Sequence, residues 1–564
     1  MLSVALNPGF VPIIAALLVL ASPREARAPI MAGAAIIALW LVLDYEFGAP
    51  AAMAQMGLPV VLLNLDALNR IFGIGLSIAL VAIALHSSAR RNRYEDAAIL
   101  LLAGGAASAL FVGDLVSFVA SASLAGLAAA WVVLASSVPG ANRSGVRLLV
   151  WQGLEGLLFL IGVALHLTSG AASSIFARMD VRQLGDACIF AALLIRTAAP
   201  LAHVWFKDVV SHASPTGAAA LTAFTSMLGV YALARLFPAE PLLIPIGAAM
   251  IMLGAFYAAA EDDLRRAGAY GMIAQTGVCV SLIGIGSPLA ISAAEGHAFA
   301  SILAFVALQL TFGAVFERMG DVRLSKLAGV ARAMPITVTL SLAAGLAVAA
   351  APGFALHATQ TVAVSAAAIW ELRWLWLLIG AAPGAMFVAL VLSPALAMHR
   401  PANKRAVFAE APFGMLLGAG LAVFFCLAVG VAPRWLYSLL PTEIAFDPFA
   451  SDAVGERLQL LGAAGLMLLA LRALRATPEL ERRDVLDVDS LYRGPVAEGA
   501  RWAGVLLLRM YGAAQSGFEH AMAALQKRIE RNIASFDQPY ARFAPGAAQA
   551  LAVTILMLLL WFIR

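Results

Sequence analysis

Two charged residues stand inside apolar segments where bilayer-spanning helices are expected. Arg196, in LLIRTAAPLAH, precedes His203 by seven residues, and Glu155, in VWQGLEGLLFL, follows Leu148 by seven. If Leu148 and His203 mark cytoplasmic helix ends, both charges lie about 10 Å deep at a rise of about 1.5 Å per residue. A buried charge usually faces the protein interior and finds a partner. The sequence therefore predicts a Glu155–Arg196 ion pair. It could lock two helices or act as a charge switch biased by ions in an adjacent subunit; the alternative is no contact.

Histidines close to Arg196 add groups that can bind and release a proton. His203 and His212 flank Trp205 at the predicted cytoplasmic end of this segment, which also contains Pro200. Proline lacks a backbone N–H, and the interrupted helix can open a polar gap within a span. Two interpretations remain open for these histidines: proton uptake from the cytoplasm and simple anchoring at the membrane interface.

The composition places these residues in a membrane protein. Of 564 residues, 62% are hydrophobic and 12% are charged, and the mean hydropathy is +0.90. These values exclude a soluble globular chain and indicate an all-α, polytopic membrane fold. Cys188, Cys279 and Cys426 lie far apart, and no phosphate-loop, haem or iron–sulfur motif occurs. We therefore expect no cofactor, no metal site, no redox chemistry in this chain and no nucleic-acid partner.

Sixteen apolar segments are candidate spans. Basic residues cluster in alternate connections, so the positive-inside rule places those connections in the cytoplasm and both termini outside. Asp66 and Asp114, near the outer surface, are expected to start helices. The candidate spans lie at about residues 3–21, 28–43, 68–86, 97–112, 115–135, 148–168, 187–203, 216–237, 241–260, 267–285, 297–316, 335–352, 373–397, 411–432, 457–475 and 543–563.

The segment 498–534 differs from the spans because it carries too many charges for a bilayer crossing. Phe518, Met522, Leu525, Ile529 and Ile533 recur at helical spacing. This pattern predicts an amphipathic helix about 55 Å long at the cytoplasmic interface. It either binds lipid headgroups alone or lies as a strut along neighbouring subunits. The predicted parts are a transmembrane core (1–435), an additional transmembrane helix and cytoplasmic connection (436–497), the lateral helix (498–534) and a C-terminal anchor (535–564).

Four stretches of the chain carry a family resemblance. They are RTAAPLAHVWFKDVVSHASPTGAAALTAFTSMLGVYALARLF, EDDLRRAGAYGMIAQTGVCVSLIGIG, EGHAFASILAFVALQLTFGAV and LDVDSLYR. Together they resemble the antiporter-like subunits shared by Mrp-type multisubunit Na+/H+ antiporters, respiratory complex I and membrane-bound hydrogenases. The resemblance covers about residues 60–400 and the tail. It implies fourteen core helices with two inverted five-helix repeats, additional helices in longer members, and ion translocation through buried lysines, a glutamate and histidines.

This sequence departs from the family pattern at most of those positions. Arg196 stands where the seventh span carries lysine, and arginine cannot lose its proton in a protein. Of the titratable groups, His297 and His399 remain near expected sites, and Glu155 is a candidate replacement for the missing glutamate. The other replaced positions are Ser123, Met227 and Phe305. The ion or proton pathway candidates are thus Arg196, Glu155, His203, His297, His399 and His212.

The resemblance implies a membrane subunit of a multisubunit monovalent cation/proton antiporter, similar to the D-type chain of Mrp antiporters, in the inner membrane of a bacterium. Its partners would be other membrane subunits, monovalent cations, protons and the lipid bilayer. Two alternatives remain open. The chain could belong to the proton-pumping arm of a complex I-like or hydrogenase-like redox complex, where it would be at most a cofactor-free subunit, or it could be a degenerate scaffold of such an assembly.

Overall fold

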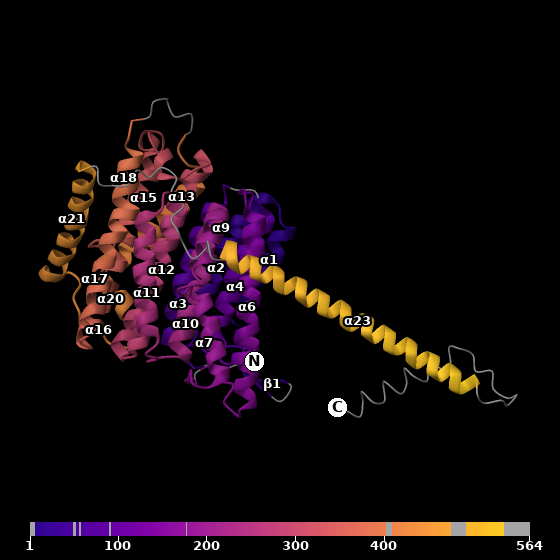
Figure 1. The fold of residues 1–564 in the computed structure, drawn as a ribbon. Coiled ribbons are helices and arrows are strands. Elements are labelled where there is room, and N and C mark those ends of the chain that lie inside the picture. Colours follow the sequence, from indigo (N-terminus) through magenta and orange to yellow (C-terminus); the bar gives the residue numbers. More distant parts are fainter. Residues whose placement is uncertain are drawn as a thin grey trace. The chain divides into compact units, whose positions relative to one another are not determined.

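The computed structural model describes residues 6–48, 52–55, 58–89, 92–175, 177–401, 409–474 and 492–534. The chain divides into two compact units, residues 1–485 and 486–564. In the described part, the first unit is a bundle of helices with one short hairpin, β1 (Ala52–Gln55) and β2 (Leu58–Val61) (Figure 1). The predicted all-α membrane fold is confirmed, and the hairpin is the addition to it.

The helices of the first half of the bundle are α1 (Phe10–Ala21), α2 (Arg24–Asp44), α3 (Ala67–Ser87), α4 (Arg93–Phe111), α5 (Leu115–Leu134), α6 (Ala141–Thr168), α7 (Leu184–Arg196), α8 (Val204–His212), α9 (Pro215–Phe224) and α10 (Ser226–Leu236). The second half contains α11 (Leu243–Ala260), α12 (Leu264–Ile285), α13 (Pro288–Met319), η1 (Leu324–Lys326), α14 (Val330–Ala333), α15 (Pro335–Val348), α16 (Ala355–Ile369), α17 (Arg373–Phe387), η2 (Val388–Leu392), α18 (Ser393–Met398), α19 (Phe413–Val431), α20 (Pro433–Tyr437) and α21 (Ser451–Ala473).

Twelve segments among the described residues are long and apolar enough to cross a membrane, and α1, α15 and α16 are shorter apolar helices. Every predicted span overlaps a helix except the last, 543–563, which lies outside the described residues. Helix α16 was not predicted, because His357, Thr359 and Gln360 lower the hydropathy of its first turns. Helices α12 and α13 are almost wholly buried in the bundle, whereas α6 and α21 present most of their surface outward.

The connections gather at two opposite ends of the bundle, as alternating spans require. At one end, hydrogen bonds join the basic connections to one another. Asn92 donates to the carbonyl of Ala135 at 2.6 Å, and Arg318 donates to the carbonyl of Glu410 at 2.8 Å. At the other end, the amide of Met179 donates to the carbonyl of Leu236 at 2.8 Å. We call these the basic end and the opposite end; which compartment each faces stays a prediction.

The predicted helix starts at the opposite end are confirmed. Asp66 is the N-cap of α3, where its Oδ1 accepts from the amide of Asn69 at 3.0 Å and the Asn69 side chain accepts in return. Asp114 is the N-cap of α5 and accepts from the amide of Ser117 at 2.8 Å. Each carboxylate therefore satisfies amides that the first turn leaves without a helical partner.

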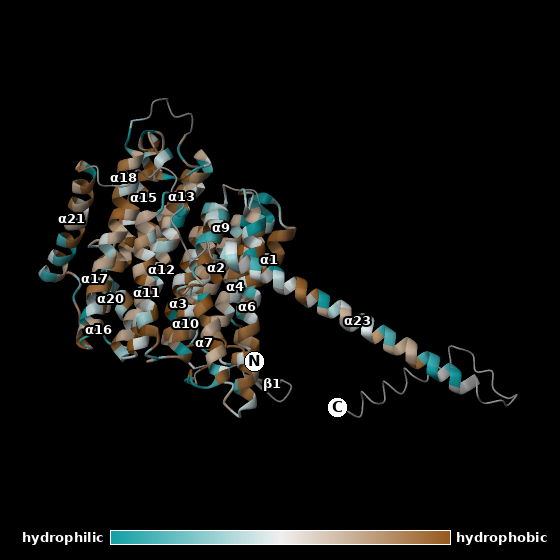
Figure 2. Ribbon diagram, in the orientation of Figure 1, coloured by the Kyte–Doolittle hydropathy of each residue, from teal (hydrophilic) through white to brown (hydrophobic). Residues whose placement is uncertain are grey.

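The second unit contains the π-helix η3 (Tyr492–Val496) and α23 (Ala497–Ala534). The predicted helix over 498–534 is confirmed as α23, which starts one residue earlier and has 38 residues. Hydrophilic and hydrophobic residues are interspersed along it (Figure 2). Phe518, Met522 and Leu525 are all exposed on this unit. Its lateral placement along the membrane stays a prediction.

Candidate functional site

Two helices are interrupted in the same manner, one in each half of the bundle. Between α7 and α8, Ala198 has φ +58°, and the amide of Ala199 donates to the carbonyl of Leu194 at 3.0 Å. Between α15 and α16, Ala350 has φ +51°, and the amide of Ala351 donates to the carbonyl of Leu346 at 3.0 Å. Each interruption also contains the sequence Ala-Ala-Pro. Because proline supplies no N–H, backbone carbonyls are released from the helix at both places.

The first interruption corrects the predicted span 187–203. Helix α7 ends at Arg196 and a new helix starts at Val204, so His203 is the N-cap of α8 rather than the end of the span. The indole Nε1 of Trp205 donates to the carbonyl of Ile195 at 2.9 Å and satisfies one released group. The chain therefore crosses the bundle as two short helices, and the imidazole of His203 is fully buried between them.

Arg196 and Glu155 are in contact, as predicted. The guanidinium Nε donates to Glu155 Oε1 at 2.5 Å, and its Nη2 donates to the carbonyl of Ala122 in α5 at 3.1 Å. The exposed fractions are 4% for Arg196 and 1% for Glu155. Helix α6 places Glu155 inward, while Leu154 and Leu157 beside it are exposed on the outer face of the bundle. The pair thus ties α5, α6 and α7 together at the residue where α7 ends. Its role in ion movement stays a prediction.

Helix α8 leads from this pair to a polar cluster at the basic end. Asp208 accepts from Arg147 Nη2 at 2.7 Å and from Ser144 Oγ at 2.9 Å. His212 Nδ1 lies 2.8 Å from the carbonyl of Asp208. The His212 side chain is partly exposed, so a proton arriving from water at this end could reach it. The sequence pattern had not indicated the Asp208–Arg147 contact.

A second buried cluster lies beside it, between α4, α9 and α12. Glu95 is 2% exposed and accepts from Ser214 and, at 2.6 Å, from Thr216. Arg265 is 1% exposed and donates to the carbonyls of Val210 at 2.6 Å and Ala213 at 2.5 Å. Arg265 therefore closes the C-terminal end of α8, where free carbonyls favour a cation.

Lys207 is a titratable residue that was not predicted from the sequence. It lies on α8, and its Nζ is 5.7 Å from the centre of the Tyr270 ring. The ring of His203 lies 6.3 Å from the same tyrosine. The sequence contained an indication of this residue, because Lys207 closely follows the His-Val-Trp element. Recognising the interruption before that element would have placed Lys207 on α8.

His297 lies in the second half of the bundle, apart from the Arg196 pair. Its Nε2 is 2.8 Å from Gln275 Oε1 on α12, and its Nδ1 is 3.2 Å from Thr359 Oγ1 on α16. His297, Gln275 and Thr359 are all buried. His399, by contrast, is exposed at the C-terminal end of α18, where its Nδ1 lies 2.8 Å from the carbonyl of Ala395. The structure therefore places His297 in a buried polar network and His399 at the surface.

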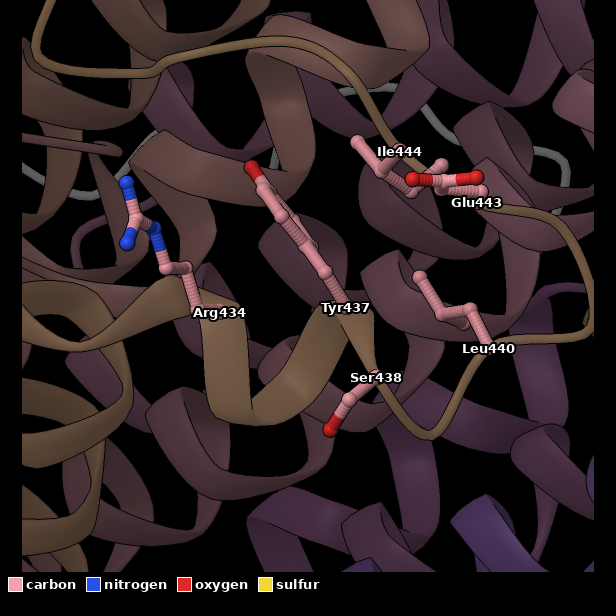
Figure 3. Close-up of a pocket in the computed structure, with 6 residues that line it drawn as sticks. All are labelled: Arg434, Tyr437, Ser438, Leu440, Glu443 and Ile444. Carbon is pink, nitrogen blue, oxygen red and sulfur yellow. The ribbon is translucent and has the colours of Figure 1, made fainter.

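A cavity of about 460 Å³ opens at the opposite end of the bundle, around α20 and the segment after it (Figure 3). Figure 3 shows Arg434 and Glu443 on opposite sides of it, with Tyr437 between them. The Tyr437 hydroxyl donates to the carbonyl of Ala358 in α16 at 3.0 Å. The cavity therefore adjoins the helix that carries Thr359, the partner of His297. Within the described ranges, no group of three His, Cys, Asp or Glu side chains could hold a metal ion.

Comparison with known proteins finds sequence similarity to membrane subunits of quinone oxidoreductases and antiporters. Residues 112–386 match the family described as NADH:quinone oxidoreductase/Mrp antiporter, TM. The NAD(P)H-quinone oxidoreductase chain 4 1 of Synechococcus elongatus is 26% identical over 340 residues, which is 54% of this chain and 61% of the relative. The matched region thus spans less than two thirds of that relative's length.

Two solved structures share the fold. The Mrp complex from Dietzia sp. DQ12-45-1b has a TM-score of 0.73 at 21% identity and covers 96% of this chain and 63% of its own. The membrane-bound sulfane sulfur reductase, an archaeal respiratory membrane complex, has a TM-score of 0.69 at 20% identity and covers 98% of this chain and 99% of its own. At these identities the likeness shows the fold.

Proposed function

We propose that this chain, which is an antiporter-like membrane subunit of the Mrp or complex I family, works in a multisubunit monovalent cation/proton antiporter, in the position of the D-type chain of Mrp assemblies. We place it in a bacterial inner membrane together with other membrane subunits. The proposal rests on one observation above all. The two interrupted helices carry different chemistry, with a fixed charge pair beside the first and a buried imidazole network beside the second.

Arg196 cannot serve as a proton relay. A guanidinium keeps its proton at any physiological pH, so the site beside the first interruption holds a constant positive charge. Glu155 balances that charge at 2.5 Å. A lysine in the same place could alternate between charged and neutral forms, which a relay needs. The first half therefore contributes a structural lock and a fixed field, and transport through this chain depends on other groups.

His297 supplies a group that can change protonation state. An imidazole can bind a proton at one ring nitrogen and release one from the other. Its two nitrogens face Gln275 and Thr359, from α12 and α16. Thr359 is in the fifth position of α16, directly after the second interruption. In our proposal the proton moves through the second half by way of His297, while His203, His212 and Lys207 line the approach from the basic end.

A second candidate is a proton-pumping-arm subunit of a redox complex. The fold match with the sulfane sulfur reductase complex extends over 99% of that chain, whereas the matched Mrp chain is longer than this one. The fold of that subunit thus covers 98% of this chain, which supports the redox-complex alternative. In that case the chain would still move protons, and the redox centres would lie in other subunits.

Purification of the intact assembly through a tag on this chain separates the two candidates. Mass spectrometry of the co-purified subunits should identify small membrane proteins and no iron–sulfur or nickel subunit if the antiporter proposal is correct. Iron–sulfur or nickel subunits in stoichiometric amounts would overturn it in favour of the redox complex. The same purification from cells that express the untagged chain serves as the control for contaminants.

A further inference from the structure

Glu295 is a buried acid that the proposed pathway has not used. It lies on α13, seven residues after Pro288, and is 1% exposed. Neither carboxylate oxygen has a hydrogen-bond partner in the described part of the chain. An ionised carboxylate in such surroundings is strongly unfavourable, whereas a carboxyl that keeps its proton is neutral and is tolerated far better. The surroundings therefore favour a protonated Glu295.

An ion pair at the opposite end of the bundle, Arg235–Asp66, acts electrostatically on Glu295. Arg235, near the end of α10, donates to Asp66, the N-cap of α3, and its Nε donates to the hydroxyl of Tyr231 at 3.3 Å. Among the described residues, the positive charge of Arg235 and the negative charge of Asp66 both act on Glu295. Their charges are opposite, so the pair exerts a weak net field on the carboxyl. Breaking the pair would change that field.

Gly296, the residue after Glu295, lies close to the wall of the cavity at the opposite end. A Cβ atom placed on Gly296 would lie 3.5 Å from a methyl group of Leu440 and 3.5 Å from Thr359. Leu440 lines the cavity at the opposite end. The segment that carries Leu440 lies over the start of α13, since the amide of Thr442 donates to Ser292 Oγ at 3.2 Å. Leu440 therefore touches both the cavity and Gly296, the residue between Glu295 and His297.

We propose that Glu295 is a proton-binding site that exchanges with water through the cavity at Leu440. In this step a hydronium ion gives its proton to a carboxylate oxygen and leaves as water, and release reverses it. The site suits a proton better than a metal ion, because no group of three His, Cys, Asp or Glu side chains among the described residues could hold a metal ion, and a hard cation requires several oxygen ligands. The place of this site on a transport route rests on the proposed function, whereas proton binding does not.

Infrared spectroscopy of the purified intact assembly tests the proposal without reference to transport. The wild type should show a protonated-carboxyl band at neutral pH that Glu295→Gln lacks and Glu295→Asp displaces. Glu371→Gln removes an exposed carboxylate and should leave the band unchanged. The same band in wild type and Glu295→Gln would overturn the proposal. If Glu295→Gln does not assemble, an unshifted band in Glu295→Asp would overturn it.

The exchange route is tested by Leu440→Trp, which should fill part of the cavity. Hydrogen–deuterium exchange of the Glu295 band should become at least tenfold slower, and an unchanged rate would overturn the route through the cavity. Transport measured on the same preparations distinguishes proton binding at Glu295 from the proposed function. An assembly that shows the Glu295 band but moves no protons would support the binding site and refute the proposed function.

Discussion

Arg196 and Glu155 meet at 2.5 Å between α7 and α6, at the residue where α7 ends. Both side chains are almost fully buried, and the guanidinium also holds a carbonyl of α5. A buried pair of this kind gives little net stability over apolar residues, but removing one partner leaves a costly unpaired charge. Because Arg196 at the end of α7 contacts both α6 and α5, the packing of these three helices fixes the place where α7 ends.

Arg196→Ala should destabilise the chain by about 3–5 kcal/mol, because Glu155 would remain buried without its cation. The double variant Glu155→Gln with Arg196→Gln should recover much of that loss, since it buries no charge. Thermal unfolding of the detergent-solubilised assembly measures both. Equal losses in the single and double variants would contradict the interpretation of the pair as a charge-balanced lock.

The exposed pair Arg323–Asp321 is a matched control for this measurement. Hydrogen bonds from Arg323 lower the pKa of Asp321, so the pair is formed, but the Arg323 side chain is 44% exposed. Surface pairs contribute about 0–1 kcal/mol. Arg323→Ala should therefore change the unfolding temperature far less than Arg196→Ala.

Leu201 should tolerate replacement by glycine in the interruption between α7 and α8. It has φ +74° and is 62% exposed, so its side chain adds backbone strain and little packing. Because a left-handed conformation costs an L-residue about 1–2 kcal/mol, Leu201→Gly should stabilise the chain by roughly 1 kcal/mol. Leu242→Gly, at another exposed leucine but with φ −62°, should not stabilise it. Thermal unfolding of the two variants should differ in sign; equal shifts would show that the interruption is not strained.

The topology can be tested with two exposed serines at opposite ends of the bundle. Ser325→Cys lies among the basic connections, and Ser438→Cys lines the cavity at the other end. With Cys188→Ser as background, a membrane-impermeant thiol reagent should label Ser438→Cys in intact cells and Ser325→Cys after permeabilisation only. The reverse pattern would invert the predicted orientation. The predicted outer position of Arg564 falls outside the described residues.

The apolar stripe of α23 should couple this chain to neighbouring subunits. Replacing Phe518, Met522 and Leu525 with serine removes three exposed apolar side chains, each worth about 1.5–3 kcal/mol if buried at an interface. The assembly should dissociate more readily on native gels. Serine at Ala513, Ala521 and Ala524 on the same helix provides a control with little apolar loss. Unchanged migration of the triple variant would leave lipid binding as the role of this stripe.

Much of the fold follows from hydropathy and charge, because a bilayer requires long apolar helices and separates basic connections from the rest. The Glu155–Arg196 contact was also predictable, because an unpaired charge inside the bilayer is costly and these two opposite charges lie at equal depth. Helix α16 was missed because three polar residues near its start pair inside the bundle rather than with solvent. Their partners become known only when the helices are packed.

The functional groups were less predictable than the helices. His203 was placed at a helix end because the sequence shows Pro200 but not that a helix resumes at Val204. Glu295 was passed over because a carboxyl beside a glycine and a histidine gives no sign of its burial. Sequence spacing indicates which residues share a helix face, whereas the absence of a hydrogen-bond partner is a property of the packed bundle.

Proton transport in everted membrane vesicles, followed with a pH-sensitive dye, tests the central claim most directly. It should be compared in wild type, His297→Gln and the double variant Glu155→Gln with Arg196→Gln, with assembly checked on native gels. If protons pass through the second half beside a fixed charge pair, His297→Gln should lose at least tenfold in rate, while the double variant stays within about twofold of wild type. Wild-type rates in His297→Gln together with lost transport in the double variant would place the route at Arg196 and contradict the account.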